Sequence, residues 1–445
     1  MKKWYVAFLT LLFSLLLTVY AQAADFDTIK IGLFYGSTAK ESVTLSSATG
    51  FTIGYEEGFS TGFDDNFTAL QECDLTELTV KKSGGAAVEA EGVLTFEQEN
   101  CYLTIYPRGG TLTVDGTEYR GGVQLKRLDT GDMTVVNIVN QEEYLYSVIG
   151  KEMSPGWNIE ALKAQAVCAR GFAVSNRAKF AKYGFHLDTT TTSQVYQGVK
   201  TETDSTRRAA DETRGLVLTH NGRVAETLYF ASAGGATANA KNVWGSEIPY
   251  LTGVIDPYEN PDEATRYSWS VSLSADEIKE ILAKRDVHIG EIQSVRALSV
   301  GDNGYVTELQ FVGTDGEYTV KNSDCRSVFG GKLHSQRYTV SGGGDVPEPE
   351  LSALSCAGKT VLSTLRLLLS PAQYPQVIQN AQDTAAYAQT AAVGDGTFLF
   401  TGNGWGHGVG MSQWGAKAMA DQGFSYDQIL TFYYTGCELK ERSTL

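Results

Sequence analysis

Basic residues are scarce in this chain of 445 residues, which has 36 Lys and Arg against 52 Asp and Glu and a formal net charge of −16. A nucleic-acid-binding protein normally carries a basic footprint, so nucleic acid is excluded as a partner. Proline is also scarce, with 9 residues, whereas there are 47 Gly and 23 Tyr. This composition favours a turn-rich β protein with aromatic-lined grooves over a helical bundle.

Motifs that hold metals are missing as well. The sequence has no C-x-x-C and no H-E-x-x-H, and its five histidines are scattered. Six cysteines permit disulfides in an exported chain, but their spacing selects no pairing. We therefore predict no metal and no cofactor.

Long apolar runs are absent except at the start of the chain. Lys2 and Lys3 precede 17 uncharged residues, Trp4–Tyr20, and Ala21–Ala23 then gives the small-x-small pattern of a signal-peptide cleavage site. We expect a signal peptide over residues 1–23. An uncleaved anchor is the alternative, and only then would the protein contact a membrane. Both interpretations predict an exported, extracytoplasmic protein.

The remaining patterns predict an α+β fold, with a mainly β-strand body, one prominent helix over about 158–183 and a late helical insertion. Asp115-Gly116 and Asn221-Gly222 each lie between strand-like runs, as in type I′ hairpins. The sequence SGGGDVPEPE reads as a linker. The expected regions are a β-rich N-terminal region (24–110), a main domain in two parts (111–341 and 396–440), and a linker with a helical insertion between those parts (342–395).

Residues Gly58–Gly62 match the G-x-S-x-G nucleophile pattern. That pattern requires a preceding strand and a following helix, and the polar residues that follow here do not predict a helix. We interpret the match as coincidence.

Glu152 is the first candidate for chemistry. It lies in a segment rich in Gly, Ser and Pro, which we expect to be a loop, beside Met153 and Trp157. Large apolar neighbours disfavour the charged form of a carboxyl group and raise its pKa, as a general acid near neutral pH requires. A solvated loop glutamate is the alternative.

Two further segments carry polar residues in suggestive patterns. Lys163, Arg170 and Arg177 recur every seven residues, so they share one helical face, which could bind an acidic sugar polymer or simply be solvated. Five glycines within Gly402–Gly410 allow close backbone approach, and Trp405 and Trp414 offer flat faces to sugars. A tightly packed turn is the alternative for the glycine-rich segment.

Several long blocks together resemble the SpoIID/LytB family, the type of stage II sporulation protein D. They are VVNIVNQEEYLYSVIGKEMSPGWNIEALKAQAVCARGFAVSNR, TSQVYQG, YFASAGGAT, VWGSEIPYLTGV and GNGWGHGVGMSQWGAKAMADQG, in the family order. The resemblance covers about 111–341 and 396–440.

The resemblance implies a peptidoglycan lytic transglycosylase that cuts glycan strands already stripped of peptides by a partner amidase. It places the catalytic residue at Glu152. It places substrate-binding or groove-lining residues at Lys163, Gln165, Arg170, His186, Gln194, Tyr196, Ser232, His407, Ser412 and Gln413. The chain departs from typical members at Gly171-Phe172. Thr189–Ser193 also stand where some members have zinc-binding cysteines, so no zinc is expected.

An ordinary glycosidase needs two carboxyl groups. In a lytic transglycosylase the 6-hydroxyl of N-acetylmuramic acid attacks its own anomeric carbon, so one carboxyl group can act first as acid and then as base. Two alternatives remain. One is a non-catalytic wall-binding activator of an N-acetylmuramoyl-L-alanine amidase. The other is a hydrolase with a second carboxylate among Glu142, Glu143 and Asp188.

Overall fold

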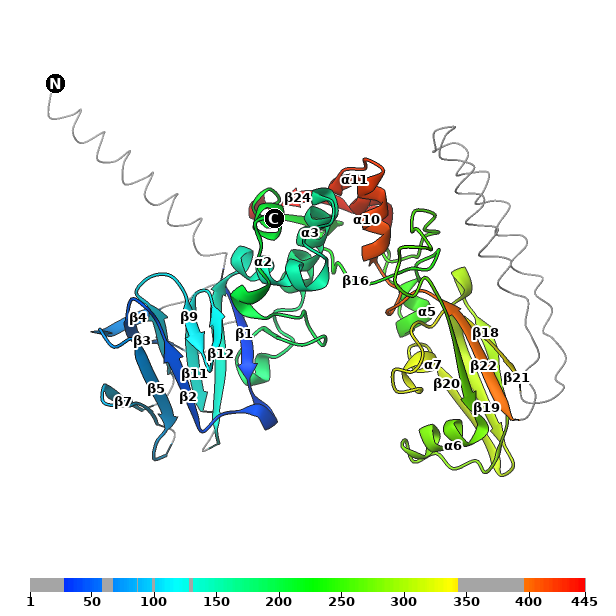
Figure 1. Ribbon diagram of the computed structural model, residues 1–445, viewed down its shortest axis with the longest axis horizontal. Helices are drawn as coiled ribbons and strands as arrows, with labels where there is room; N and C mark the ends of the chain where they lie inside the picture. Colours follow the sequence, from blue (N-terminus) through cyan, green and yellow to red (C-terminus); the bar gives the residue numbers. More distant parts are fainter. Residues whose placement is uncertain are drawn as a thin grey trace, which may run out of the picture.

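The computed structural model describes residues 28–57, 67–85, 87–97, 101–127, 131–342 and 396–444. The expected signal peptide, the Gly58–Gly62 pattern and nearly all of the expected insertion lie outside these residues. Within them, no helix combines the length and apolar character needed to cross a membrane. Two β-rich lobes are joined by a helical bridge, so that the molecule forms an arch (Figure 1). This mixture of sheets and helices confirms the predicted α+β class.

The N-terminal lobe contains a seven-stranded sheet. Only the pairing of β1 with β13 is parallel, and the other pairings are antiparallel. In spatial order the strands are β13 (Leu187–Asp188), β1 (Thr28–Phe34), β12 (Met133–Asn140), β11 (Gly122–Arg127), β8 (Cys101–Pro107), β3 (Phe51–Glu57) and β4 (Phe67–Cys73). Residues on both sides of the expected boundary at 110/111 therefore share one sheet.

A second, six-stranded antiparallel sheet completes this lobe. Its order is β10 (Thr117–Tyr119), β9 (Leu112–Val114), β2 (Ser42–Ser46), β5 (Glu77–Lys82), β6 (Val88–Ala90) and β7 (Leu94–Phe96). Asp115 and Gly116 have φ of 44° and 84° between β9 and β10, which confirms the predicted type I′ turn. Buried residues of both sheets and of the bridge form one apolar core.

The bridge is built from helices that come from distant parts of the sequence. They are α2 (Gln141–Glu152), α3 (Ile159–Ser175), α4 (Asp204–Asp211), α10 (Gln413–Asp421) and α11 (Tyr426–Tyr433). Beside them lie a three-stranded sheet of β15 (Arg223–Val224), β14 (Leu216–His220) and β24 (Glu438–Glu441), and a parallel pair of β16 (Tyr229–Phe230) and β23 (Met411–Ser412). The hairpin at Asn221-Gly222 is confirmed.

Two expectations for the bridge are wrong. The segment before Glu152 is not a loop but helix α2, which begins where Asn140 Oδ1 accepts hydrogen bonds from two backbone amides. The long helix ends at Ser175 rather than near 183, because the Asn176 side chain bonds the carbonyl of Phe172 and the chain then turns. The glycine-rich segment leads into helix α10, which was not predicted.

The C-terminal lobe has its own apolar core between two three-stranded antiparallel sheets. One sheet is β17 (Ser268–Ser274), β22 (Thr397–Asn403) and β21 (Tyr338–Gly342), and the other is β18 (Ile292–Val300), β19 (Val306–Gly313) and β20 (Gly316–Lys321). The short helices are α5 (Ala240–Trp244), α6 (Ala275–Ala283) and α7 (Asp324–Ser327). Gly342 pairs with Phe398, so the chain leaves this sheet and returns to it at neighbouring strand ends.

Candidate functional site

Glu152 is the last residue of α2, at the junction with α3. Met153 adopts an extended conformation that ends α2, and Asn158 then caps α3 by accepting a hydrogen bond from the Glu160 amide at 3.0 Å. Glu152 is partly exposed, whereas Met153 beside it is buried. This short connection between two packed helices fixes the position of the carboxyl group.

The Glu152 carboxyl group has two weak donors. The Val195 amide donates to Oε1 at 3.4 Å, and Gln413 Nε2 donates to Oε2 at 3.5 Å. Desolvation raises the pKa of Glu152, and these two hydrogen bonds and the charge of Lys151 only partly offset that rise. Among the described residues, no carboxylate acts on this pKa.

Glutamine side chains surround Glu152. Gln413 Nε2 also lies 3.5 Å from Gln165 Oε1, while Gln165 Nε2 is buried without a hydrogen-bond partner among the described residues. Gln194 donates to the Tyr229 hydroxyl at 2.9 Å and accepts from the Tyr144 hydroxyl at 3.2 Å. Burial is the main cause of the raised pKa of both tyrosines, and the negative charge of Glu152 is the second cause. Both hydroxyl groups therefore interact electrostatically with Glu152. The structure thus brings Glu152, Gln165, Gln194 and Gln413 together.

Ser232 and Ser412 both donate hydrogen bonds to a buried carboxylate, Glu259, which was not predicted from the sequence. Glu259 accepts hydrogen bonds from Ser232 Oγ at 2.8 Å, from the Ala233 and Gly234 amides at 2.6 and 2.9 Å, and from Ser412 Oγ. Ser412 Oγ also caps α10, whose first residue is Gln413. Glu259 therefore fixes the start of the helix that presents Gln413 to Glu152.

Asp256 is a second buried carboxyl group that the sequence did not reveal. It accepts from the Tyr433 hydroxyl at 2.6 Å, and burial together with the charge of Glu259 raises its pKa to about 7. Burial also raises the pKa of Glu259, although the four hydrogen bonds that it accepts oppose this rise. Both residues follow the VWGSEIPYLTGV block closely, but nothing in their spacing pointed to them. Tyr229 was not predicted either, although it begins the YFASAGGAT block. Its hydroxyl group could have marked it as a residue of the site.

Arg170 does not reach the surface. Its side chain is 0% exposed and donates to both oxygens of Glu142 and to the Leu216 carbonyl. Arg177 is also buried and donates to Gln141. The expected contact of Arg170 with a glycan is therefore corrected, because a guanidinium enclosed in this way cannot meet a polymer. Lys163 is mostly buried and pairs with Glu160 at 2.9 Å and Glu212 at 2.7 Å.

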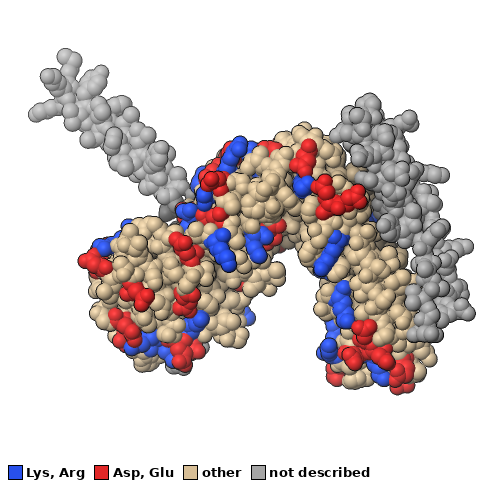
Figure 2. All heavy atoms as spheres, viewed as in Figure 1, with Lys and Arg blue, Asp and Glu red and all other residues tan. Residues whose placement is uncertain are grey.

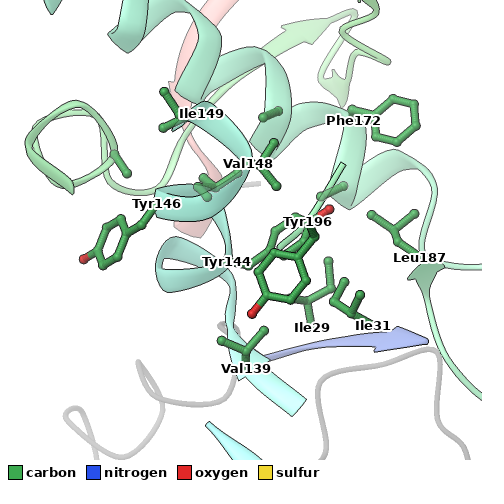
Figure 3. Packing of buried hydrophobic residues seen from close by; sticks show 14 of the residues in the cluster. Ile29, Ile31, Val139, Tyr144, Tyr146, Val148, Ile149, Phe172, Leu187 and Tyr196 are labelled. Carbon is green, nitrogen blue, oxygen red and sulfur yellow. The ribbon is translucent and has the colours of Figure 1, made fainter. Parts of the chain in front are cut away.

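Two other expected groove residues lie in the interior. Tyr196 is 4% exposed, donates to Asn137 at 2.9 Å and packs beside Tyr144 above Ile29, Ile31 and Val139 (Figure 3). His186 is buried, and its Nδ1 accepts from the Lys30 amide on β1 at 3.0 Å. Tyr196 thus joins β12 of the lobe to α2 of the bridge, whereas His186 contacts β1 beside its pairing with β13 inside the lobe. Both side chains are interior, which corrects the expectation that they line a groove.

His407 lies apart from Glu152, between the rings of Phe230 and Trp244 at 5.5 and 5.6 Å. Desolvation and the charge of Arg326 lower the pKa of His407 to about 4, so it is neutral at physiological pH. Trp414 packs against Trp157, with ring centroids 4.8 Å apart, next to Gln413.

Metal binding has no support in this arrangement. Among residues 28–342 and 396–444 that are described, no group of three His, Cys, Asp or Glu side chains could hold an ion. The five cysteines in the described segments are all free of disulfides. The prediction that no cofactor is needed remains a prediction.

Comparison with known proteins adds an independent line of information. Residues 129–220 match the stage II sporulation protein family, and residues 250–360 match a domain of unknown function. An uncharacterised protein of Brachyspira hyodysenteriae is 33% identical over 329 residues, which are 74% of this chain and 73% of that protein.

Two named relatives come from Bacillus subtilis. Stage II sporulation protein D is 28% identical over 327 residues, covering 70% of this chain and 77% of the relative. The amidase enhancer is 28% identical over 354 residues, covering 75% of this chain and 46% of the relative. The matched family segment contains α2 and α3, and with them Glu152. This chain is a member of the SpoIID/LytB family.

Proposed function

We propose that the protein is a peptidoglycan lytic transglycosylase that cleaves the bond between N-acetylmuramic acid and N-acetylglucosamine and leaves 1,6-anhydro-muramic ends. Its substrate is the glycan strand from which peptides have been removed. It acts outside the cytoplasmic membrane, in sporulation or in cell-wall remodelling. Relatives named stage II sporulation protein D and amidase enhancer support the cell-wall setting.

The observation that carries the proposal is the isolation of Glu152. Its pKa is raised by desolvation, and no carboxylate of the described residues contributes to that rise. Among the hydrolase candidates, Glu142 is bound to Arg170, Glu143 faces Arg120 at 3.4 Å, and Asp188 accepts from Tyr35 at 3.0 Å and Thr190 at 2.8 Å. A desolvated carboxyl group on which no second carboxylate acts suits a reaction in which the substrate supplies the nucleophile.

The reaction then needs one residue in two roles. Neutral Glu152 donates its proton to the glycosidic oxygen as the bond to the anomeric carbon breaks. The 6-hydroxyl of the same muramic acid attacks that carbon, and the Glu152 carboxylate removes the hydroxyl proton, which regenerates the acid. No water is consumed. The reacting hydroxyl belongs to the sugar that is already bound, so the second step has the advantage of an intramolecular reaction.

Gln413 and Gln194 have supporting roles in this scheme. The Gln413 amide donates to Glu152 and so stabilises the carboxylate between the two steps. Gln194, bonded to Tyr144 and Tyr229, holds these two hydroxyl groups in one orientation beside Glu152. Gln165 is buried, and its Oε1 lies 3.5 Å from Gln413 Nε2, so it supports Gln413 from within the protein rather than contacting the glycan.

A second candidate function is activation of a cell-wall amidase without catalysis. It is favoured by the relative named amidase enhancer. This function would not require the desolvated carboxyl group at Glu152.

The products separate these functions. Peptide-free glycan strands would be incubated with the wild type, with Glu152→Gln, and with Glu143→Gln as a matched control on the same helix, and the products read by mass spectrometry. We expect anhydro ends from the wild type and the control, and a loss of at least about 10²–10⁴-fold for Glu152→Gln. Reducing ends would indicate a hydrolase, and no cleavage by a folded wild type would favour the activator.

A further inference from the structure

A group of basic and aromatic side chains lies on the C-terminal lobe, next to the loop that leads to Ser412, and the scheme above does not use it. We call it the basic–aromatic cluster, and its members are Trp244, Arg266, Arg326, His334, Trp405 and His407. Figure 2 shows basic side chains along the inner edge of the arch, on the bridge and on this lobe. Arg266, Arg326 and His334 fall within the stretch that matches a domain of unknown function.

Arg266 is exposed but held in place. The carbon of its guanidinium lies 4.3 Å from the centre of the Trp405 ring, and Nη1 lies 3.2 Å from His334 Nδ1. The His334 ring in turn packs edge-on against Trp269 at 5.5 Å. Arg266 has a φ of 60°, a left-handed conformation that costs free energy in a non-glycine residue. The backbone and three rings thus orient this guanidinium in advance.

Arg326 supplies the second positive charge. Its Nε donates weakly to the Leu333 carbonyl at 3.4 Å, and the side chain is only partly buried. Its charge contributes to the lowered pKa of both His334 and His407, after desolvation. Arg266 contacts Trp405, which is two residues from His407, and His407 in turn packs against Trp244, so these members of the cluster are adjacent.

The cluster has no counter-charge of its own. Within the described segments, neither Arg266 nor Arg326 forms an ion pair, although other cations of the same lobe do, including Lys279 with Glu291 and Lys332 with Glu277. Two arginines held near each other repel, and in an acidic chain nearby carboxylates would be easy to supply. An anionic ligand would remove this repulsion.

The aromatic members of the cluster indicate which kind of molecule carries the anionic group. Trp244 and Trp405 are 40% and 37% exposed, which is unusual for such large apolar side chains. Flat aromatic faces suit sugar rings, and a guanidinium binds a carboxylate through two parallel hydrogen bonds. A glycan with carboxylates on some of its sugars combines the two chemistries.

We propose that the basic–aromatic cluster is a second binding subsite, which holds a carboxylate-bearing sugar of the same glycan strand that reaches Glu152. This inference rests on the proposed function, because a peptide-free strand exposes the lactyl carboxylate of each muramic acid. Trp405 and Gln413 are eight residues apart on one segment, so at most about 27 Å separates them. A strand several sugars long spans such a distance. The subsite would select strands without peptides, since an amide-linked peptide removes the carboxylate.

Binding can be measured without turnover. In the Glu152→Gln background, Arg266→Gln and Arg326→Gln would be combined, and calorimetry would give the affinity for peptide-free strands and for uncharged N-acetylglucosamine oligomers of similar length. Arg296→Gln with Lys284→Gln is the matched control, because both residues are exposed on the same lobe, are unpaired within the described segments and carry the same total charge.

We expect the cluster variant to bind peptide-free strands on the order of tenfold more weakly, while the control changes affinity less than about twofold. Affinity for the uncharged oligomers should be the same in both variants. Added salt should weaken strand binding by the parent protein more than by the cluster variant.

Three results would overturn the proposal. They are an equal loss in the control, an equal loss for the uncharged oligomers, and equally tight binding of a sulfated polysaccharide such as heparin with the same dependence on the arginines. If the double variant fails to fold, Arg266→Gln alone answers the question, because Arg266 is exposed. The product assay on the wild type separately decides the proposed catalysis.

Discussion

Arg170 on α3 donates from Nε at 2.8 Å and from Nη2 at 2.5 Å to the two carboxylate oxygens of Glu142 on α2, and both side chains are almost fully buried. This pair joins the first turn of α2 to the middle of α3. Glu152 ends α2, and Gln165 lies on α3. The ion pair therefore sets the relative position of the two helices that carry the site.

Arg170→Ala should strongly destabilise the protein, because it removes the cationic partner of buried Glu142 and leaves only the Gly215 amide as a donor to that carboxyl group. Breaking a buried pair in this way costs about 3–5 kcal/mol of unfolding free energy, a large part of the stability of a typical protein. Urea denaturation would measure the loss. Arg208→Ala, which breaks the exposed pair with Glu212, is the control and should cost less than about 1 kcal/mol. Normal stability of Arg170→Ala with weaker glycan binding would instead restore Arg170 as a substrate contact.

The parts of the fold that could be predicted from the sequence are those that depend on neighbouring residues alone. The turns at Asp115-Gly116 and Asn221-Gly222 were predictable because two adjacent residues adopt positive φ whatever surrounds them. Helix α2 was not, because it follows β12 directly and its apolar residues Val148 and Ile149 also suit a strand. At the candidate site, the family resemblance correctly pointed to the neighbours Glu152 and Gln413. It could not show that Arg170 and Tyr196 are interior residues, since burial depends on partners distant in the sequence.

Gln413→Met should move the alkaline limb of the pH–activity profile to higher pH. The Gln413 amide donates to Glu152 and lowers its pKa, so its loss lets desolvation raise that pKa further. Glu152 must be neutral to donate its proton, and a higher pKa keeps it neutral to higher pH. The measurement is kcat/KM for release of anhydro products across pH. Gln422→Met at the exposed far end of α10 is the control, and identical profiles for both variants would contradict this role of Gln413.

Asp256→Asn should remove part of the pH dependence of stability. The pKa of Asp256 is raised to about 7 by burial and by Glu259, whereas in the unfolded chain it lies near 3.8. A carboxyl group with a raised pKa contributes most stability below about pH 4 and loses that contribution as the pH rises to 7. The variant should therefore be more stable than the wild type at pH 8, on the order of 2 kcal/mol, and less dependent on pH between 4 and 7. Urea denaturation at several pH values tests this, with exposed Asp262→Asn as control, and equal slopes for the wild type and Asp256→Asn would contradict it.

Replacing residues 346–395 with a short Gly/Ser loop should leave a folded protein that still releases anhydro products. The described residues on either side of this segment come together in the C-terminal lobe, because Gly342 pairs with Phe398 on adjacent antiparallel strands. A short loop there turns β21 and β22 into an ordinary hairpin, and closing a shorter loop costs less conformational entropy.

The replacement also leaves every residue placed near Glu152 unchanged. Circular dichroism and thermal unfolding would report the fold, and mass spectrometry the products. The Glu152→Gln variant with the same replacement is the control for residual cleavage. A folded replacement protein that binds peptide-free strands but no longer cuts them would show that the replaced segment contributes to the catalytic site.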